Sequence, residues 1–262
     1  MKCLSFVLTM LALTPAPLPA DTIVLAADPW CPFNCVPGSD KPGFLVDVAR
    51  LAFARNHHTV IYKTLPWSRA IADARIGHFA GIIGASKREA ADFIFPATPQ
   101  MVAQHTLFTL TDSRWHYDNP SSLETIRLGA IDDYSYGSLA ERYIELNRNR
   151  PDRLILLSGP HIIPRLIAML NLRRIDAFIA ERAVLYHTLS SARGSAVMLR
   201  EAGQAGTESL YIAFSPALEQ ATQYARELEE GIDAMHKSGE WERLMADYGL
   251  KSPALQPTSD AL

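Results

Sequence analysis

Segments with the apolar pattern of buried strands alternate with segments of helical periodicity, and this alternation occurs twice along the chain. In the first half, the strand-like segments TIVLAA (22–27), TVIYKTL (59–65) and AGIIGAS (80–86) alternate with helical segments that begin near Phe44 and Trp67. Such alternation predicts an α/β fold with a largely parallel sheet covered by helices on both faces. In sheets of this kind, ligands bind beyond the carboxyl ends of the strands.

The pattern begins again in the second half. Strands are expected at RLGAI (127–131), RLILLS (153–158) and IDAFIA (175–180), and helices at 138–149, at 162–174 and from 182 to near Gly194. A capping box formed by Ser121 and Glu124 is expected to begin a short helix just before them. The second half therefore predicts a second α/β lobe.

Two extended apolar segments, 103–111 and 208–215, lie between these patterns and are placed to carry the chain from one lobe to the other. Two crossings make a hinge. The predicted division is lobe 1 at 21–108 and 212–250, and lobe 2 at 109–211. The C-terminal helical region is interrupted at Gly239 and is expected to pack back on the lobes. Residues 251–262 lack apolar periodicity and are expected to form a flexible tail.

Residues 1–20 have the layout of a secretory signal peptide, with Lys2, an apolar stretch, and then small residues and prolines up to Ala20. A buried N-terminal strand or helix is the alternative interpretation. Cleavage would release a soluble periplasmic or secreted protein. Removal of Lys2 changes the formal charge from -3 to -4, which offers no basic field for nucleic acid or a membrane surface.

Cleavage would also leave two cysteines, Cys31 and Cys35, in an oxidising compartment, which favours a disulfide. Closing so short a loop contributes only about 2 kcal/mol to the free energy of unfolding, so a role in local shape is the better explanation. A C-x3-C metal site is the alternative. The eight histidines show no companion ligand spacing, so they are expected to be surface or packing residues and no metal is expected.

Several stretches occur in the order found in a known family and over nearly all of the predicted mature chain. They are DPWCPF, KPGFLVDVARLAF, LPWSRAIADARIG, DFIFPATP, AIDDYSYGS, RRIDAFIAERAVLYH, SLYIAFSPA and KSGEWERLMADYGL. They resemble solute-binding protein family 3, the periplasmic proteins that serve polar amino-acid ABC importers. The resemblance implies a type II periplasmic binding protein fold, in which two α/β lobes joined by two hinge crossings close on a small solute without altering it.

The resemblance places an aromatic wall of the cleft at Trp30 and Phe33, and the disulfide would hold this wall in place before the ligand arrives. Ordinary core aromatics are the alternative interpretation. Trp67 and Arg69 begin the second helix of the first lobe. Arg69 is expected either to hold a ligand carboxylate or to form a surface salt bridge.

The turn GASKRE leaves a strand, so its free backbone N–H groups, with Ser86 and either Lys87 or Arg88, are candidates for binding an anionic group. The family has an arginine near here that grips the ligand's α-carboxylate. The spacing of Arg88 to the following FIFP differs from that pattern by about one residue, which leaves its role open.

In the second lobe, Ser135 and Tyr136 begin a helix and form another candidate anion site, with an ordinary helix cap as the alternative. Glu181 follows IDAFIA, where the family usually has an aspartate for the ligand's ammonium; a helix-capping glutamate is the alternative. The chain also departs from the family at Ala80, which replaces an aspartate, so the identity of the ligand should not be copied from a standard member.

The expected function is capture of a small polar solute, an amino acid or related zwitterion, by a monomer that delivers it to an ABC transporter permease. No cofactor and no catalytic residue is expected, since G-x-S-x-G, S-x-x-K and metal clusters are absent from the sequence. One alternative is a cyclohexadienyl dehydratase-like enzyme on the same scaffold, with Glu181 as the proton donor. The other is a ligand-sensing partner of a membrane receptor.

Overall fold

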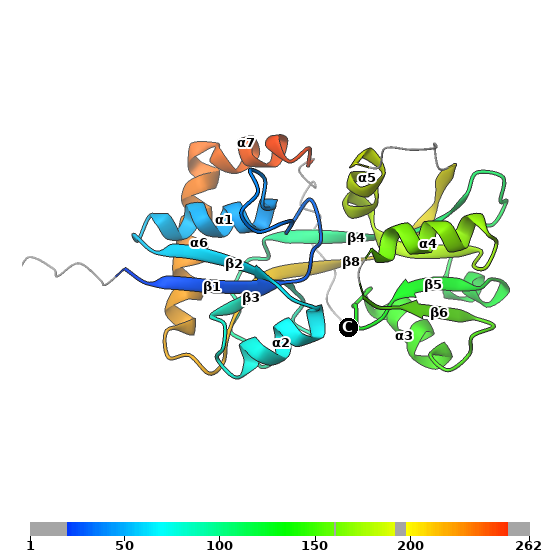
Figure 1. The fold of residues 1–262 in the computed structure, drawn as a ribbon, viewed down its shortest axis with the longest axis horizontal. Coiled ribbons are helices and arrows are strands. Elements are labelled where there is room, and N and C mark those ends of the chain that lie inside the picture. The colour runs from blue at the N-terminus through cyan, green and yellow to red at the C-terminus, as the bar shows by residue number, and fades with distance from the viewer. Residues whose placement is uncertain (1–19, 160, 192–197, 251–262) are drawn as a thin grey trace, which may run out of the picture.

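The computed structural model describes residues 20–159, 161–191 and 198–250 as two α/β lobes side by side (Figure 1). The predicted α/β two-lobed fold is confirmed. The signal peptide expected at residues 1–20 lies, except for residue 20, outside the described residues, and so does the tail expected at 251–262.

The first lobe contains three parallel strands, β1 (Thr22–Ala27), β2 (Thr59–Thr64) and β3 (Gly81–Ala85), with β1 in the centre. Helices α1 (Phe44–Ala54) and α2 (Trp67–Arg75) connect them, as the alternating pattern predicts. The apolar residues of α1 recur at helical spacing, and the buried set is Phe44, Leu45, Val46, Val48, Ala49, Ala52 and Phe53. Because the three strands are parallel, the loops that follow them all leave the sheet at the carboxyl ends of the strands.

The second lobe repeats the arrangement with β5 (Leu128–Ile131), β6 (Leu154–Leu157) and β7 (Ala177–Glu181), in which β5 is parallel to both neighbours. Its helices are α3 (Ser138–Asn147), α4 (Ile162–Asn171) and α5 (Arg182–Ser191). Gly129 lies where a Cβ would come within 2.7 Å of Ile175 and 2.8 Å of Leu166, so the glycine allows α4 to pack closely on the sheet.

Two long antiparallel strands, β4 (Met101–Leu110) and β8 (Leu199–Phe214), run between the lobes (Figure 1). β8 pairs with β3 in the first lobe and β4 pairs with β7 in the second, so the eight strands have the order β2-β1-β3-β8-β4-β7-β5-β6. The two lobes are thus connected through paired strands. The division of the chain at 108/109 and 211/212 stays a prediction.

The strand expected at 208–215 is the last part of a 16-residue strand that begins at Leu199. Its first part, residues 199–207 (LREAGQAGT), contains two glycines, two alanines and a glutamate, residue types that are depleted in strands. Pairing with β4 over its whole length holds this part extended. Tertiary pairing therefore overrides the local preference.

The capping box expected from Ser121 and Glu124 is wrong. The 3-10 helix η1 (Pro120–Thr125) begins two residues earlier than expected, with Asn119 as its N-cap. The Asn119 side chain accepts a hydrogen bond from the Ser121 N–H, and the Ser122 hydroxyl oxygen accepts one from the Asn119 N–H. Proline at the first helical position has no N–H to satisfy and favours this start.

The C-terminal region folds back on the first lobe as α6 (Ala221–Ser238) and α7 (Glu240–Asp247), separated by Gly239 in a left-handed conformation with φ 69°. A Cβ on Gly231 would lie 2.6 Å from Ala52, so this glycine allows α6 to cross α1 closely. Among the residues that the structure describes, none of the helices has the length and apolar character needed to cross a membrane.

Candidate ligand-binding site

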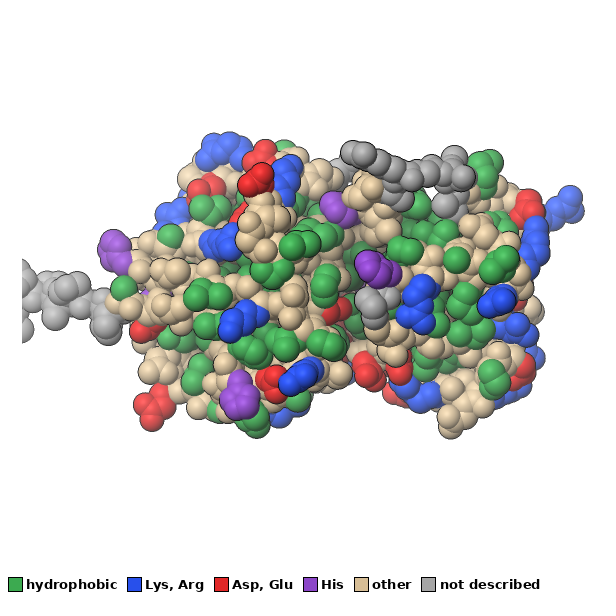
Figure 2. All heavy atoms as spheres, in the orientation of Figure 1, with side chains coloured by type: hydrophobic (Ala, Val, Ile, Leu, Met, Phe, Trp, Pro, Cys, Tyr) green, Lys and Arg blue, Asp and Glu red, His purple; other side chains and the backbone are tan. Residues whose placement is uncertain are grey.

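A pocket lies where the two lobes and the two crossing strands meet, with an empty volume of about 400 Å³ that includes space open to solvent. The first lobe supplies most of its lining, from loops, α2 and β3. The second lobe supplies Tyr134 and Ser135, and the crossing strands supply His105, Glu208 and Leu210. The lining residues from the first lobe are Asp28, Trp30, Asn34, Trp67, Ile83, Gly84 and Glu89. Figure 2 shows acidic side chains on the surface where the lobes meet.

The loop after β1 is shaped by the Cys31–Cys35 disulfide, whose Cα atoms lie 4.7 Å apart, and the predicted disulfide is present. The Trp30 N–H donates to the Asn34 carbonyl at 2.6 Å, and the Trp30 ring packs on Phe33 at 5.0 Å between centroids. A Cβ on Gly43 would lie 2.4 Å from the Phe33 carbonyl oxygen, so glycine is required where the loop meets α1. The result is a cross-linked loop that presents Trp30 and Asn34 to the pocket.

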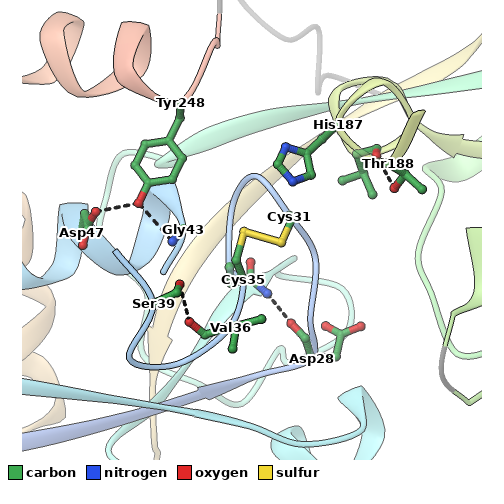
Figure 3. The surroundings of a disulfide bond; sticks show 12 residues. Asp28, Cys31, Cys35, Val36, Ser39, Gly43, Asp47, His187, Thr188 and Tyr248 are labelled. Carbon is green, nitrogen blue, oxygen red and sulfur yellow. Dashed lines mark hydrogen bonds between the residues drawn. A yellow bond between two sulfur atoms is a disulfide. The ribbon is translucent and has the colours of Figure 1, made fainter. Parts of the chain in front are cut away.

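His187 of α5 faces this disulfide from the second lobe (Figure 3). The ligand atoms of Cys31, Cys35 and His187 all lie within 4.8 Å of one another. The two sulfur atoms are bonded to each other, whereas a metal would need thiolates. The group therefore acts as a contact between the disulfide loop and the second lobe.

Asp28 and Tyr134 meet across the pocket from opposite lobes. Each follows the carboxyl end of a central strand, β1 or β5, and the Tyr134 hydroxyl donates a hydrogen bond to the Asp28 carboxylate. Burial raises the pKa of Asp28 to about 6, against the opposing effect of this hydrogen bond. Burial and the nearby Asp28 charge hold the pKa of Tyr134 well above its ordinary value. The Tyr134 hydroxyl therefore keeps its proton, and its hydrogen bond to Asp28 connects the two lobes.

Glu89 lies in the turn after β3. Its carboxylate accepts hydrogen bonds from the Ser86 N–H at 3.1 Å, the Ser86 hydroxyl at 2.9 Å and the Trp67 indole N–H at 3.2 Å. Burial raises the pKa of Glu89, and these hydrogen bonds oppose that effect. The candidate anion site of this turn is thus occupied by a carboxylate of the chain itself.

Glu208 enters the pocket from β8 and is 9% exposed. It accepts a hydrogen bond from the Ser135 hydroxyl at 2.8 Å, and its Oε2 lies 3.7 Å from Nε2 of His105. Burial alone would raise the pKa of Glu208, but His105 and the Ser135 hydroxyl lower it below its ordinary value. Glu208 is therefore ionised at neutral pH.

Three of the residues predicted from sequence, Trp30, Trp67 and Ser135, line this pocket. Ser86 lies beside it and is bound to Glu89. Phe33 is 4% exposed and belongs to the hydrophobic core behind Trp30.

Four other predicted residues do not line the pocket. Tyr136 is buried, and its hydroxyl oxygen accepts a hydrogen bond from the Ile131 N–H at 2.8 Å. The Arg69 guanidinium is on the surface, 3.6 Å from Asp73, with a side chain that is 70% exposed. Arg88 is 4.0 Å from Glu141 of the second lobe. The Glu181 carboxylate accepts from the Val184 N–H at 2.8 Å, which matches the helix-capping alternative.

Sequence reasoning did not single out the acidic residues of the pocket, nor His105 and Tyr134. The S-x-x-E spacing of Ser86 and Glu89 is a capping-box signal that could have identified their contact. Asp28 and Tyr134 follow strands and could have been noted on that ground. His105 was expected to be a surface or packing residue. It reaches the pocket only because β4 crosses between the lobes.

Solved structures share this fold. A histidine kinase sensor domain with similarity to periplasmic binding proteins matches with a TM-score of 0.72 at 18% identity, over 88% of this chain and 98% of that one. The arginine-binding protein ArgBP from T. maritima, as its P235GK mutant, matches with a TM-score of 0.68 at 14% identity, over 88% and 95%. AbpA, an amino acid ABC transporter substrate-binding protein from Streptococcus pneumoniae bound to L-arginine, matches at 0.66 and 18%, over 87% and 94%.

No family model matches the sequence, and no curated protein matches it. The structural likenesses show that the chain has the two-lobed fold of periplasmic binding proteins. Substrate-binding proteins of amino-acid ABC transporters are among the neighbours, which agrees with the resemblance to solute-binding protein family 3. At 13–18% identity these neighbours show the fold alone.

Proposed function

We propose that this protein is a periplasmic solute-binding protein that captures a small polar solute by closure of its lobes and delivers it to an ABC importer. The observation that carries the proposal is the pocket itself, which takes its lining from both lobes and from both crossing strands. A solute that contacts both lobes binds the closed form more tightly than the open form, and so shifts the population towards closure. A permease that recognises only the closed form would then receive loaded protein.

Within this proposal, Trp30, Trp67 and Ser135 are the sequence-predicted residues that contact the solute. The aromatic faces of the two tryptophans would enclose its apolar part, as in many small-molecule sites. The disulfide loop would supply Trp30 in a fixed position, which lowers the ordering cost of binding. Ser135 would contribute from the opposite lobe.

A second candidate is the sensing of the same kind of solute, because one structural neighbour is a histidine kinase sensor domain. Sensing would use the same closure and a different partner. The dehydratase alternative fits the site less well, because prephenate and arogenate carry carboxylates and the pocket lining is itself acidic, with Asp28, Glu89 and Glu208.

The experiment that tests the proposed function is small-angle X-ray scattering combined with thermal unfolding over a panel of amino acids, amines, organic acids and sugars. A true ligand should raise the unfolding temperature, since ligand at a hundred times its dissociation constant adds about 2.7 kcal/mol of stability. The bound solute should also be recovered chemically unchanged after incubation with the protein. Turnover of the ligand would contradict the proposal, and so would the failure of every solute class to bind.

A further inference from the structure

We propose that the pocket binds a small organic cation that carries no carboxylate, an amine or guanidine, rather than an amino-acid zwitterion. The inference rests on the proposed solute-binding function and names the chemical class of its ligand. It begins from the charge of the lining. Asp28, Glu89 and Glu208 contribute three carboxyl groups, and none of the twelve lining residues is a lysine or an arginine.

Five hydrogen-bond donors at the pocket are already engaged by these carboxylates. The Tyr134 hydroxyl donates to Asp28, and the Ser135 hydroxyl donates to Glu208. Three further donors, the Ser86 N–H, the Ser86 hydroxyl and the Trp67 indole N–H, point at Glu89. A ligand carboxylate that took one of these five donors would displace a carboxylate of the protein and lie beside it, and the lining holds no lysine or arginine to offset the repulsion.

The start of α3 repeats this arrangement in the second lobe. The Tyr136 N–H donates to the Glu141 carboxylate at 3.1 Å, so a carboxylate of the protein occupies this candidate anion site as well. The two cations of the turn after β3 have partners outside the lining. Arg88 lies 4.0 Å from Glu141, and the Lys87 ammonium lies over the Tyr211 ring, 4.9 Å from its centroid.

His105 supplies an independent sign that a polar ligand belongs here. Its side chain is 5% exposed and lines the pocket. Nε2 lies 3.7 Å from Oε2 of Glu208, and neither ring nitrogen has a partner at hydrogen-bond distance within the described part of the chain. Buried polar atoms in native proteins are seldom left without a partner. A ligand N–H or hydroxyl in the pocket would provide one.

The remaining walls also suit a cation. Trp30, Trp67 and Tyr134 line the same pocket as the three acidic residues. Aromatic faces attract organic cations through their quadrupole, and tryptophan does so most strongly. Carboxylates with unused lone pairs and aromatic rings together form a site for an ammonium or guanidinium group.

The test compares ligands that differ only by a carboxylate, using isothermal titration calorimetry on the unaltered protein. The pairs are 1,4-diaminobutane with L-ornithine, and agmatine with L-arginine. We expect at least one decarboxylated member to bind at least tenfold more tightly than its amino acid. Equal or tighter binding of the amino acids would overturn the inference and leave the proposed solute-binding function standing, as would binding of an organic acid or sugar alone. If no solute of any class binds, the proposed function fails as well.

Variants then assign the cation to this pocket. Glu208→Gln and Glu89→Gln each keep the shape of the side chain and remove one charge, and each should weaken binding of the preferred cation about ten- to a hundredfold. Glu230→Gln is the matched control, because Glu230 is 65% exposed on α6 and pairs with Arg226, 3.7 Å away. It should leave the affinity unchanged.

Circular dichroism of each variant shows whether it is folded. If one pocket variant does not fold, the other decides, and if neither folds, the comparison of ligand pairs on the unaltered protein decides. Equal affinities for both folded pocket variants and the control would overturn the assignment.

Discussion

The hydroxyl of Tyr134 donates a hydrogen bond to the carboxylate of Asp28, and these residues belong to opposite lobes. Each lies just beyond the carboxyl end of the central strand of its lobe. The two symmetric positions thus meet in one contact that spans the pocket. Under the proposed function, this contact would favour closure of the lobes even before a ligand adds its own contacts to both.

Tyr134→Phe should shift the population towards the open form, because it removes one hydrogen bond to a charged or partly charged group, a contact that contributes about 1.5–3 kcal/mol when fully formed. The radius of gyration measured by small-angle X-ray scattering should increase. Tyr186→Phe is the matched control. The Tyr186 hydroxyl donates to Glu201 at 2.6 Å on the surface of the second lobe, so its loss should leave the radius unchanged. An unchanged radius for Tyr134→Phe would contradict a role in closure.

The contribution of Asp28 to stability should fall between about pH 4 and pH 6. The pKa of this residue is raised from 3.8 to about 6 by burial, so the folded protein holds the proton more tightly than the unfolded chain. Its contribution is therefore fully present below pH 3.8 and is lost as the pH rises through about 6. The largest possible effect is about 3 kcal/mol.

The measurement is the free energy of unfolding as a function of pH for the unaltered protein and for Asp28→Asn. The contributions of the other titrating groups cancel in the difference between the two curves. Tyr62, Tyr134 and Glu89 are the titratable neighbours that act on or around Asp28. The binding of a cation should have the opposite dependence and strengthen as the pH rises through about 6, because only the ionised carboxylate attracts it. A difference curve that is flat from pH 4 to pH 7 would contradict the assignment of this pKa.

Replacement of both Cys31 and Cys35 by serine should affect ligand binding more than it affects folding. The closed loop is short, so its loss should lower the free energy of unfolding by only about 2 kcal/mol. The loop carries Trp30 and Asn34 into the pocket, and without the bond their positions must be ordered when the ligand binds. Chemical denaturation and calorimetric titration measure the two effects. An unchanged affinity would contradict the prediction that the disulfide orders the loop before the ligand binds.

The buried hydrogen bond between His58 and Glu227 should stabilise the first lobe, and its loss should leave ligand binding in the pocket unchanged. His58 accepts from the Asp21 N–H at 2.9 Å through Nδ1, so Nε2 is the atom that donates to Glu227, also at 2.9 Å. Glu227→Ala leaves this buried donor without a partner and should cost about 1–3 kcal/mol of unfolding free energy. Glu230→Ala, one turn further along α6 and exposed, should cost less than about 0.5 kcal/mol. Equal losses would contradict the assignment.

Much of the architecture could be predicted from the sequence because it depends on local periodicity. The alternation of strand and helix patterns identified nearly every element, both lobes and the disulfide loop. The prediction was less accurate where a local pattern is weak, as in residues 199–207, which pairing with β4 holds in β8. The expected capping box failed because Asn119, a residue equally suited to capping, is better placed than Ser121.

The sequence by itself determined that the chain alternates strands and helices in two lobes joined by two crossings, since these features follow from the spacing of apolar residues. Only the tertiary structure decided which polar side chains share the pocket. Asp28, Glu89 and Glu208 are far apart in the chain and come from two loops and a crossing strand, and no local pattern links them. Their gathering follows from the packing of the lobes, and it is this gathering that gives the pocket its acidic character.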